Sequence, residues 1–117
     1  MAFQYFPQAQ QTFEIPLIAN DNAYLGDVVS SESNDPEKPI SGGLFRLTKG
    51  EKLVYTYTYD EVKIVLEGDY TITDETGQTT VAKPGDVLYF PKGSTITFTT
   101  TDYGLAFYAG QRKKNAF

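Results

Sequence analysis

Hydrophobic and polar residues alternate along part of the chain in the way that a half-buried strand requires. Between positions 52 and 59 every second residue is apolar or aromatic: Leu53, Tyr55, Tyr57 and Tyr59. Side chains two residues apart lie on the same face of a strand. This segment therefore predicts a strand with one face made of leucine and tyrosine.

Similar short segments recur at close spacing from Gly43 onward. We expect strands at 61–66, 69–73, 79–82, 86–90, 95–100 and 104–109. The stretches 74–77 and 83–86 contain the Gly, Pro and Asp residues that are typical of hairpin turns. No segment shows a convincing helical period of apolar residues. The pattern predicts an all-β sandwich or barrel, since a closed or doubly layered sheet leaves few exposed strand edges.

The length of 117 residues fits one domain. Residues 1–15 are rich in Gln and weakly patterned, and we interpret them as an N-terminal arm whose aromatic residues dock on the domain or on a partner subunit. We assign the domain itself to residues 16–117. The charged, Pro-containing stretch 30–39 predicts a loop near its mouth or edge.

Charge and hydropathy exclude several partners. The net charge of −5 opposes binding to a phosphate backbone, so we expect no nucleic-acid partner. The sequence has neither an apolar run long enough to span a membrane nor the layout of a secretory signal, which predicts a cytoplasmic protein without membrane contact.

The sequence contains no Cys and no His. Thiolate nucleophiles, disulfides and imidazole ligands are therefore unavailable. A single carboxylate among tyrosines cannot supply the three or four ligands of a stable transition-metal site. We expect no bound metal and no cofactor.

Two segments resemble the paired motifs of the cupin family. In the first, Glu61 and Gly68 match the motif, while Tyr55 and Tyr57 stand where the family has its first two metal-binding histidines. The second segment, 84–96, matches at Gly85, Pro91 and Gly93 and has Ile96 at the third histidine position. This resemblance implies a jelly-roll β-barrel, also called a double-stranded β-helix, of the RmlC-like type.

A narrower resemblance is to the ethanolamine-utilisation cupins, the EutQ-like group, whose members also lack the metal histidines. It is carried by Thr56, by 59–61 and 65–68, and by 91–94 with Ile96 and Phe98. It implies a homodimer with a small-molecule pocket in the barrel, and bacterial members of the group are associated with acetate kinase activity. The Gly-Lys step of a phosphate-binding loop does not occur in this sequence.

The candidate catalytic residues are Glu61, Lys63 and Tyr57. If Glu61 points inward as the cupin position does, Lys63 shares its face of the strand and the tyrosines line the same wall. Glu61 could then act as a base, and Lys63 or a tyrosine could stabilise an oxyanion. The candidate substrate-binding residues are Tyr55, Arg46, Tyr59, Tyr89 and Tyr108.

Each of these residues also has a structural interpretation. Glu61 and Lys63 could form a solvated or structural ion pair, and the tyrosines could simply be the wall of the core. Arg46 could offer its guanidinium to a substrate carboxylate, or it could be exposed on an edge strand.

The preferred hypothesis is a metal-independent, non-redox acid-base enzyme acting on a small carbonyl or carboxylate metabolite, such as a cyclase, isomerase or lyase of secondary (polyketide) metabolism. One alternative is an ethanolamine-utilisation or acetate-kinase-like protein. A second alternative is a non-catalytic module that binds a small molecule or a partner protein.

Overall fold

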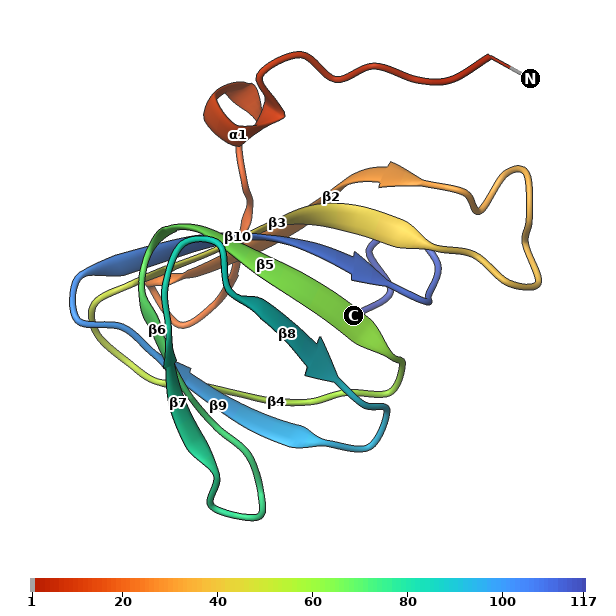
Figure 1. Cartoon of the computed structure of the whole chain (residues 1–117). Coiled ribbons are helices and arrows are strands. Elements are labelled where there is room, and N and C mark those ends of the chain that lie inside the picture. Colours follow the sequence, from red (N-terminus) through yellow and green to blue (C-terminus); the bar gives the residue numbers. More distant parts are fainter. Residues whose placement is uncertain (1) are drawn as a thin grey trace.

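The protein is built from two antiparallel sheets that face each other, as the computed structural model shows for residues 2–117 (Figure 1). The larger sheet has six strands in the order β1-β2-β3-β10-β5-β8, and the smaller has four in the order β4-β9-β6-β7. The strands are β1 (Leu17–Ala19), β2 (Ala23–Ser30), β3 (Ser41–Thr48), β4 (Leu53–Thr56), β5 (Glu61–Gly68), β6 (Tyr70–Thr73), β7 (Thr79–Ala82), β8 (Val87–Phe90), β9 (Thr95–Thr99) and β10 (Tyr103–Gly110).

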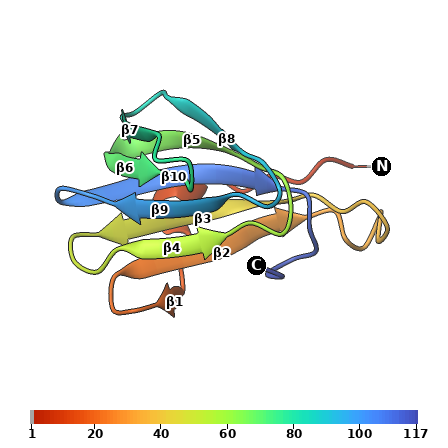
Figure 2. The ribbon, with the colours of Figure 1, turned by 90° about the horizontal axis from the view of Figure 1, so that it is seen from below.

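The all-β class and the jelly-roll arrangement predicted from the sequence are confirmed, with one correction. Of the two arrangements that the pattern left open, the doubly layered one is present and the β-barrel is not closed, because the strands form two separate hydrogen-bonded sheets and, within residues 2–117, no strand pairing joins one sheet to the other. The two sheets lie as layers one above the other in Figure 1, and in the view from below their strands overlap (Figure 2); side chains from both sheets form the core between them. Each sheet therefore keeps its own edge strands, with β1 and β8 on the larger and β4 and β7 on the smaller.

Aromatic rings from both sheets form the core. Phe45 of β3 packs on Tyr70 of β6 with ring centroids 5.4 Å apart and meets the edge of Phe98 of β9 at 5.3 Å. Phe90 of β8 stacks on Tyr57 at 5.2 Å. Contacts of this kind bury large apolar area and fix the spacing of the two layers.

The strands expected after position 60 are confirmed to within two residues at each end. Strands β1 to β3 were not predicted individually, and β3 shows why. Nearly all of its residues are buried, and it lies inside the sheet between β2 and β10. It therefore lacks the alternation of a half-exposed strand.

The N-terminal residues run along the outside of the larger sheet and include the short helix α1 (Ala9–Thr12) (Figure 1). Gln10 donates a hydrogen bond of 2.8 Å to Glu67 on β5. Phe3 is 91% exposed, so its side chain does not dock on the domain, whereas Gln4 and Phe6 lie against β2. The boundary at residue 15 stays a prediction. In the described part of the chain, no helix is long and apolar enough to cross a membrane.

Gly43 lies at a close backbone contact in the larger sheet. A Cβ atom at this position would overlap the carbonyl oxygen of Gly26 and lie 2.6 Å from the Tyr108 hydroxyl. We expect Gly43→Ala to lower the free energy of unfolding by about 3 kcal/mol, since the backbone of β2 cannot yield. Gly42→Ala is the matched control, because its Cβ would first meet the Phe107 ring at 3.1 Å. Equal urea midpoints for the two variants would contradict this account.

Candidate functional site

A cavity of about 390 Å³ lies between the two sheets. It is bordered by β4, which is an edge strand of the smaller sheet, and by β1 and β2 of the larger sheet. Its wall is largely aromatic and aliphatic, and its polar side chains come from one short stretch of the chain. The residues around it are Ile18, Ala19, Leu25, Phe45, Leu53, Val54, Tyr55, Tyr57, Tyr59, Glu61, Lys63, Phe98 and Phe117. A small-molecule site in a protein has this character, with apolar walls and a few convergent polar groups.

An acid and an amine lie next to each other at the inner end of the cavity. Glu61 and Lys63 are two apart on β5, so both side chains point between the sheets, as the sequence predicted. Lys63 Nζ lies 3.3 Å from Glu61 Oε2, and the two side chains are only 2% and 1% exposed. The pair is therefore a buried ion pair, and the solvated surface pair considered as an alternative is wrong.

Aromatic rings surround the amine. Lys63 Nζ lies 4.4 Å from the ring centroid of Phe45, 4.8 Å from that of Phe98 and 5.4 Å from that of Phe90. Ring faces attract a cation. Burial nevertheless lowers the pKa of Lys63, and the neighbouring Glu61 only partly opposes this effect.

Tyr57 also holds the carboxylate of Glu61. Its hydroxyl donates a hydrogen bond of 2.6 Å to Glu61 Oε2, the same oxygen that faces Lys63. Burial raises the pKa of Tyr57 far above its usual value, and the adjacent Glu61 raises it further. The phenol therefore keeps its proton and acts as a donor to Glu61. The other carboxylate oxygen, Oε1, accepts no hydrogen bond from any side chain in residues 2–117.

Two further tyrosines form a hydroxyl pair on the cavity wall. The Tyr55 and Tyr59 hydroxyl oxygens are 3.0 Å apart, and either of them can be the donor. The hydrogen bond between the two hydroxyl groups uses the proton of one of them. The other hydroxyl, which accepts this bond, can still donate its own proton to a third group. The pair can therefore donate a hydrogen bond into the cavity.

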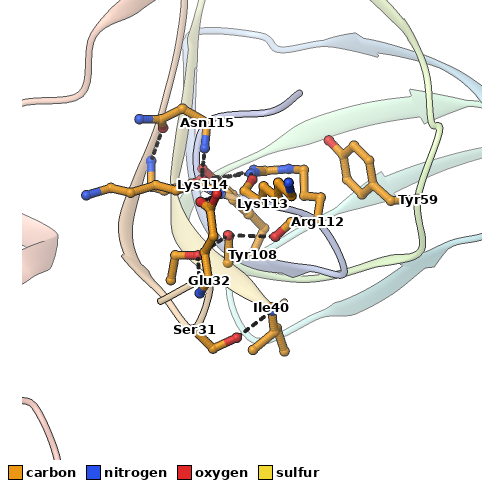
Figure 3. A network of polar contacts seen from close by, with 12 residues as sticks. Ser31, Glu32, Ile40, Tyr59, Tyr108, Arg112, Lys113, Lys114 and Asn115 are labelled. Carbon is orange, nitrogen blue, oxygen red and sulfur yellow. Dashed lines mark hydrogen bonds and ion pairs between the residues drawn. The ribbon is translucent and has the colours of Figure 1, made fainter. Parts of the chain in front are cut away.

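A second buried ion pair joins Arg112 to Asp27, and Figure 3 shows the polar network around Arg112. Asp27 on β2 accepts hydrogen bonds from both terminal nitrogens of Arg112, at 2.7 and 2.9 Å, and from the Tyr108 hydroxyl at 2.6 Å. The backbone N–H of Asn115 also donates to Asp27. This network fixes the chain after β10 against β2.

The second ion pair is connected to the cavity wall through Arg112. Its guanidinium carbon lies 5.1 Å from the ring centroid of Tyr59 and 4.9 Å from that of Phe117. Both rings border the cavity. The chain after β10 therefore contributes to the wall, and Arg112 helps to orient the Tyr59 ring.

The remaining predicted substrate-binding residues lie elsewhere. Arg46 is half-buried, does not border the cavity, and lies 5.9 Å from the ring centroid of Tyr103. It is on β3, an interior strand, so the expected edge position is wrong. Tyr89 is 60% exposed and its hydroxyl donates to Asp60 on the outer surface. Tyr108 is fully buried with its hydroxyl on Asp27.

Sequence reasoning missed Asp27, Arg112 and Phe117. Asp27 and Arg112 are 85 residues apart and belong to no motif, so the sequence does not indicate that they form a buried pair. The one available signal was the Asp in an otherwise apolar segment of β2. Among residues 2–117, no three His, Cys, Asp or Glu residues gather in a way that could hold a metal ion.

Solved structures define the class of fold. The chain superposes on an RmlC-like cupin with a double-stranded β-helix fold from Methanocaldococcus jannaschii with a TM-score of 0.56 and 19% identity, covering 62% of this chain and 69% of that one. It also matches DMSP lyase DddQ from Ruegeria pomeroyi with a TM-score of 0.60 and 16% identity, covering 67% of this chain and 41% of that one. At such low identity these likenesses show the fold alone, and the fold is that of a cupin.

A family model described as "Ethanolamine utilisation protein EutQ" matches residues 19–111. The chain therefore belongs to the EutQ family, as its motifs indicated. It is 53% identical over 47 residues to acetate kinase EutQ of Escherichia coli K12, covering 40% of this chain and 20% of that protein. It is 30% identical over 89 residues to acetate kinase EutQ of Clostridioides difficile, covering 76% of this chain and 54% of that protein. The chain thus spans about half or less of these relatives.

A solved structure of unknown function from Rhizobium leguminosarum has a similar length. It superposes with a TM-score of 0.69 and 26% identity, and the match covers 97% of this chain and all (100%) of that one. The likeness to that protein therefore extends over the arm as well as the two sheets.

The ion pair between Glu61 and Lys63 makes a prediction about stability. Glu61→Gln leaves a buried ammonium without a counter-charge, and Lys63→Met leaves a buried carboxylate, so each should lower the free energy of unfolding by about 3–5 kcal/mol. The double variant removes both charges and should cost much less than the sum of the two. Urea unfolding of the four proteins checks this. Additive losses would show that the two side chains do not interact.

The Asp27 network predicts how stability depends on pH. Burial alone would raise the pKa of Asp27, but hydrogen bonds from Arg112, the Asn115 backbone and Tyr108 outweigh it and hold this pKa below its usual value. The resulting stability is fully present above the unfolded-state pKa of about 3.9 and is lost as pH falls through the folded-state pKa.

Asp27→Asn should therefore be less stable at pH 7 and should lose less stability than the parent protein when acidified below about pH 4. Urea midpoints measured across this range give the comparison. Asp21→Asn is the control, since Asp21 is exposed and its carboxylate accepts no hydrogen bond within residues 2–117, so its acid profile should follow that of the parent protein. Parallel acid profiles for the Asp27 variant and the parent would argue against the network.

Proposed function

We propose that this EutQ-family protein binds a small carbonyl compound in the cavity and catalyses a non-redox proton transfer on it, with Glu61 as the base. The reaction class is that of an isomerase, cyclase or lyase. The observation that supports it most directly is the arrangement of Glu61, whose Oε2 is held by Tyr57 and Lys63 while Oε1 has no hydrogen-bond partner in the described chain.

The cavity offers a group for each part of such a reaction. Oε1 of Glu61 would take a proton from the carbon next to the carbonyl, because it is the carboxylate oxygen left free. The free hydroxyl proton of the Tyr55–Tyr59 pair would bind the developing oxyanion. Tyr57 would be a positioning residue, since its own proton is committed to Glu61.

An acetate-kinase-like role is the second candidate, favoured by the names of the two EutQ relatives. A nucleotide would bring several negative charges toward a buried carboxylate in a chain of net charge −5, which is unfavourable. Thermal unfolding with ATP, Mg²⁺ and acetate distinguishes this role. A rise in Tm that requires both nucleotide and acetate would support the kinase and count against the base mechanism.

A non-catalytic binding module is the third candidate, supported by the same apolar cavity. Prolonged incubation with a bound carbonyl compound that is recovered chemically unchanged would favour it. The homodimer and the cytoplasmic location also stay proposals, and light scattering of the purified chain tests the first of them.

The proposed proton transfer can be tested without knowing the natural substrate. The protein is incubated in D2O with acetone, acetaldehyde or pyruvate, and loss of the α-proton signal is followed by ¹H NMR. We expect exchange with at least one of them, and we expect Glu61→Gln to slow it by at least about a hundredfold, the usual contribution of a general base.

Glu67→Gln is the matched control, because Glu67 is on the same strand but bonds to Gln10 and Tyr103 rather than facing the cavity. Near-UV circular dichroism verifies that each variant is folded. Undiminished exchange in a folded Glu61→Gln variant would remove Glu61 from the mechanism.

A further inference from the structure

Lys63 differs from every other lysine in the described chain. It is the only one that is buried, and it borders the cavity, while the others are exposed. An amine in an apolar cavity is a nucleophile when it is unprotonated, and desolvation favours the unprotonated form. Lys63 is therefore placed to react with a bound carbonyl group rather than only to balance the charge of Glu61.

We propose that Lys63 forms an imine with a small aldehyde bound in the cavity. This inference rests on the proposed function, because it assigns the substrate class of the same cavity. An aldehyde fits better than a carboxylate, since a second anion would have to approach Glu61 in a buried site. Aldehydes are also the carbonyl compounds that condense most readily with an amine.

Glu61 supplies the proton transfer that the step requires. The ion pair first converts to its neutral form when a proton passes over the 3.3 Å from Lys63 Nζ to Glu61 Oε2. The free amine then attacks the carbonyl carbon, the C–N bond forms, and the nitrogen loses a proton to the oxygen. The resulting hydroxyl takes the proton of Glu61 and leaves as water. The products are a protonated imine, the Glu61 carboxylate and one water molecule, with no change in oxidation state.

The surroundings of Lys63 suit the product as well as the reactant. The protonated imine carries its charge at the same nitrogen, so Phe45, Phe98 and Phe90 would face it as they now face the ammonium. Glu61 would remain its counter-ion. Imine formation therefore neither creates nor removes a buried charge. An imine also makes the neighbouring carbon more acidic than the parent aldehyde does, which would assist the proton abstraction assigned to Glu61.

Reductive trapping tests the proposal on the full chain. The protein is treated at pH 7 with acetaldehyde, the smallest aldehyde that has an α-hydrogen, and sodium cyanoborohydride, and the ethyl groups are located by peptide mass mapping. We expect Lys63 to be modified at least about tenfold faster than exposed lysines such as Lys83 and Lys92, because burial lowers the pKa of Lys63 and the cavity holds the aldehyde next to its amine.

Controls separate reactivity from folding. Lys63→Arg should leave only the slow surface reaction, with trapping at Lys83 unchanged. Modification confined to the exposed lysines of the parent protein, which needs no variant to be folded, would overturn the proposal.

The two proposals fail in different ways. Exchange of α-protons in D2O without an adduct at Lys63 would keep Glu61 as a base and overturn the imine. An adduct at Lys63 without exchange would keep the imine and overturn the proposed proton transfer. Neither exchange nor adduct would overturn both.

Discussion

The structure depends on keeping an ammonium group inside a hydrophobic core. Lys63 could not be buried there alone, because removing an unpaired charge from water costs several kcal/mol. Three features of the fold compensate: Glu61 lies two residues earlier on the same strand, Tyr57 fixes that carboxylate, and aromatic rings from both sheets face the nitrogen. Because the rings come from different sheets, the ammonium also helps to set the distance between the two layers. The Lys63 ammonium and the aromatic rings therefore belong both to the cavity and to the packed core.

The second ion pair supports the wall of the same cavity. Asp27 and Arg112 join β2 to the segment after β10, and Arg112 lies against the Tyr59 ring. Tyr59 in turn meets Tyr55 and the edge of Tyr57. A continuous set of contacts thus leads from the chain after β10 to the carboxylate of Glu61. Rotamer freedom at the site is small as a result, which is what acid-base chemistry requires of its positioning residues.

Features of the site that depend on residues close together in the sequence could be predicted, and features that depend on the pairing of distant strands could not. The inward direction of Glu61 and Lys63 follows from residue parity on a strand, and the motif glycine at 68 has a physical reason, since its φ of +68° favours glycine. Asp27 and Arg112 were not predictable, because their pairing depends on which distant strands are neighbours. The wrong edge position of Arg46 has the same origin: β2 and β3 lack clear alternation, so the sheet order could not be derived. Closure of the barrel likewise depends on strand pairing that one sequence does not specify.

The cavity wall is largely apolar because tyrosines stand at two of the positions where the cupin motifs have metal-binding histidines. In a cupin that binds a metal, the positions of Tyr55 and Tyr57 face a cation that is held by several ligands. Here the cation is the ammonium of Lys63, which comes from the chain itself and needs only one carboxylate as a partner. The tyrosines at the former ligand positions then position Glu61 and offer a hydroxyl proton to the cavity. In the proposed reaction, the amine of Lys63 on β5 would react with the carbonyl carbon and so take the place of a metal that polarises the carbonyl oxygen.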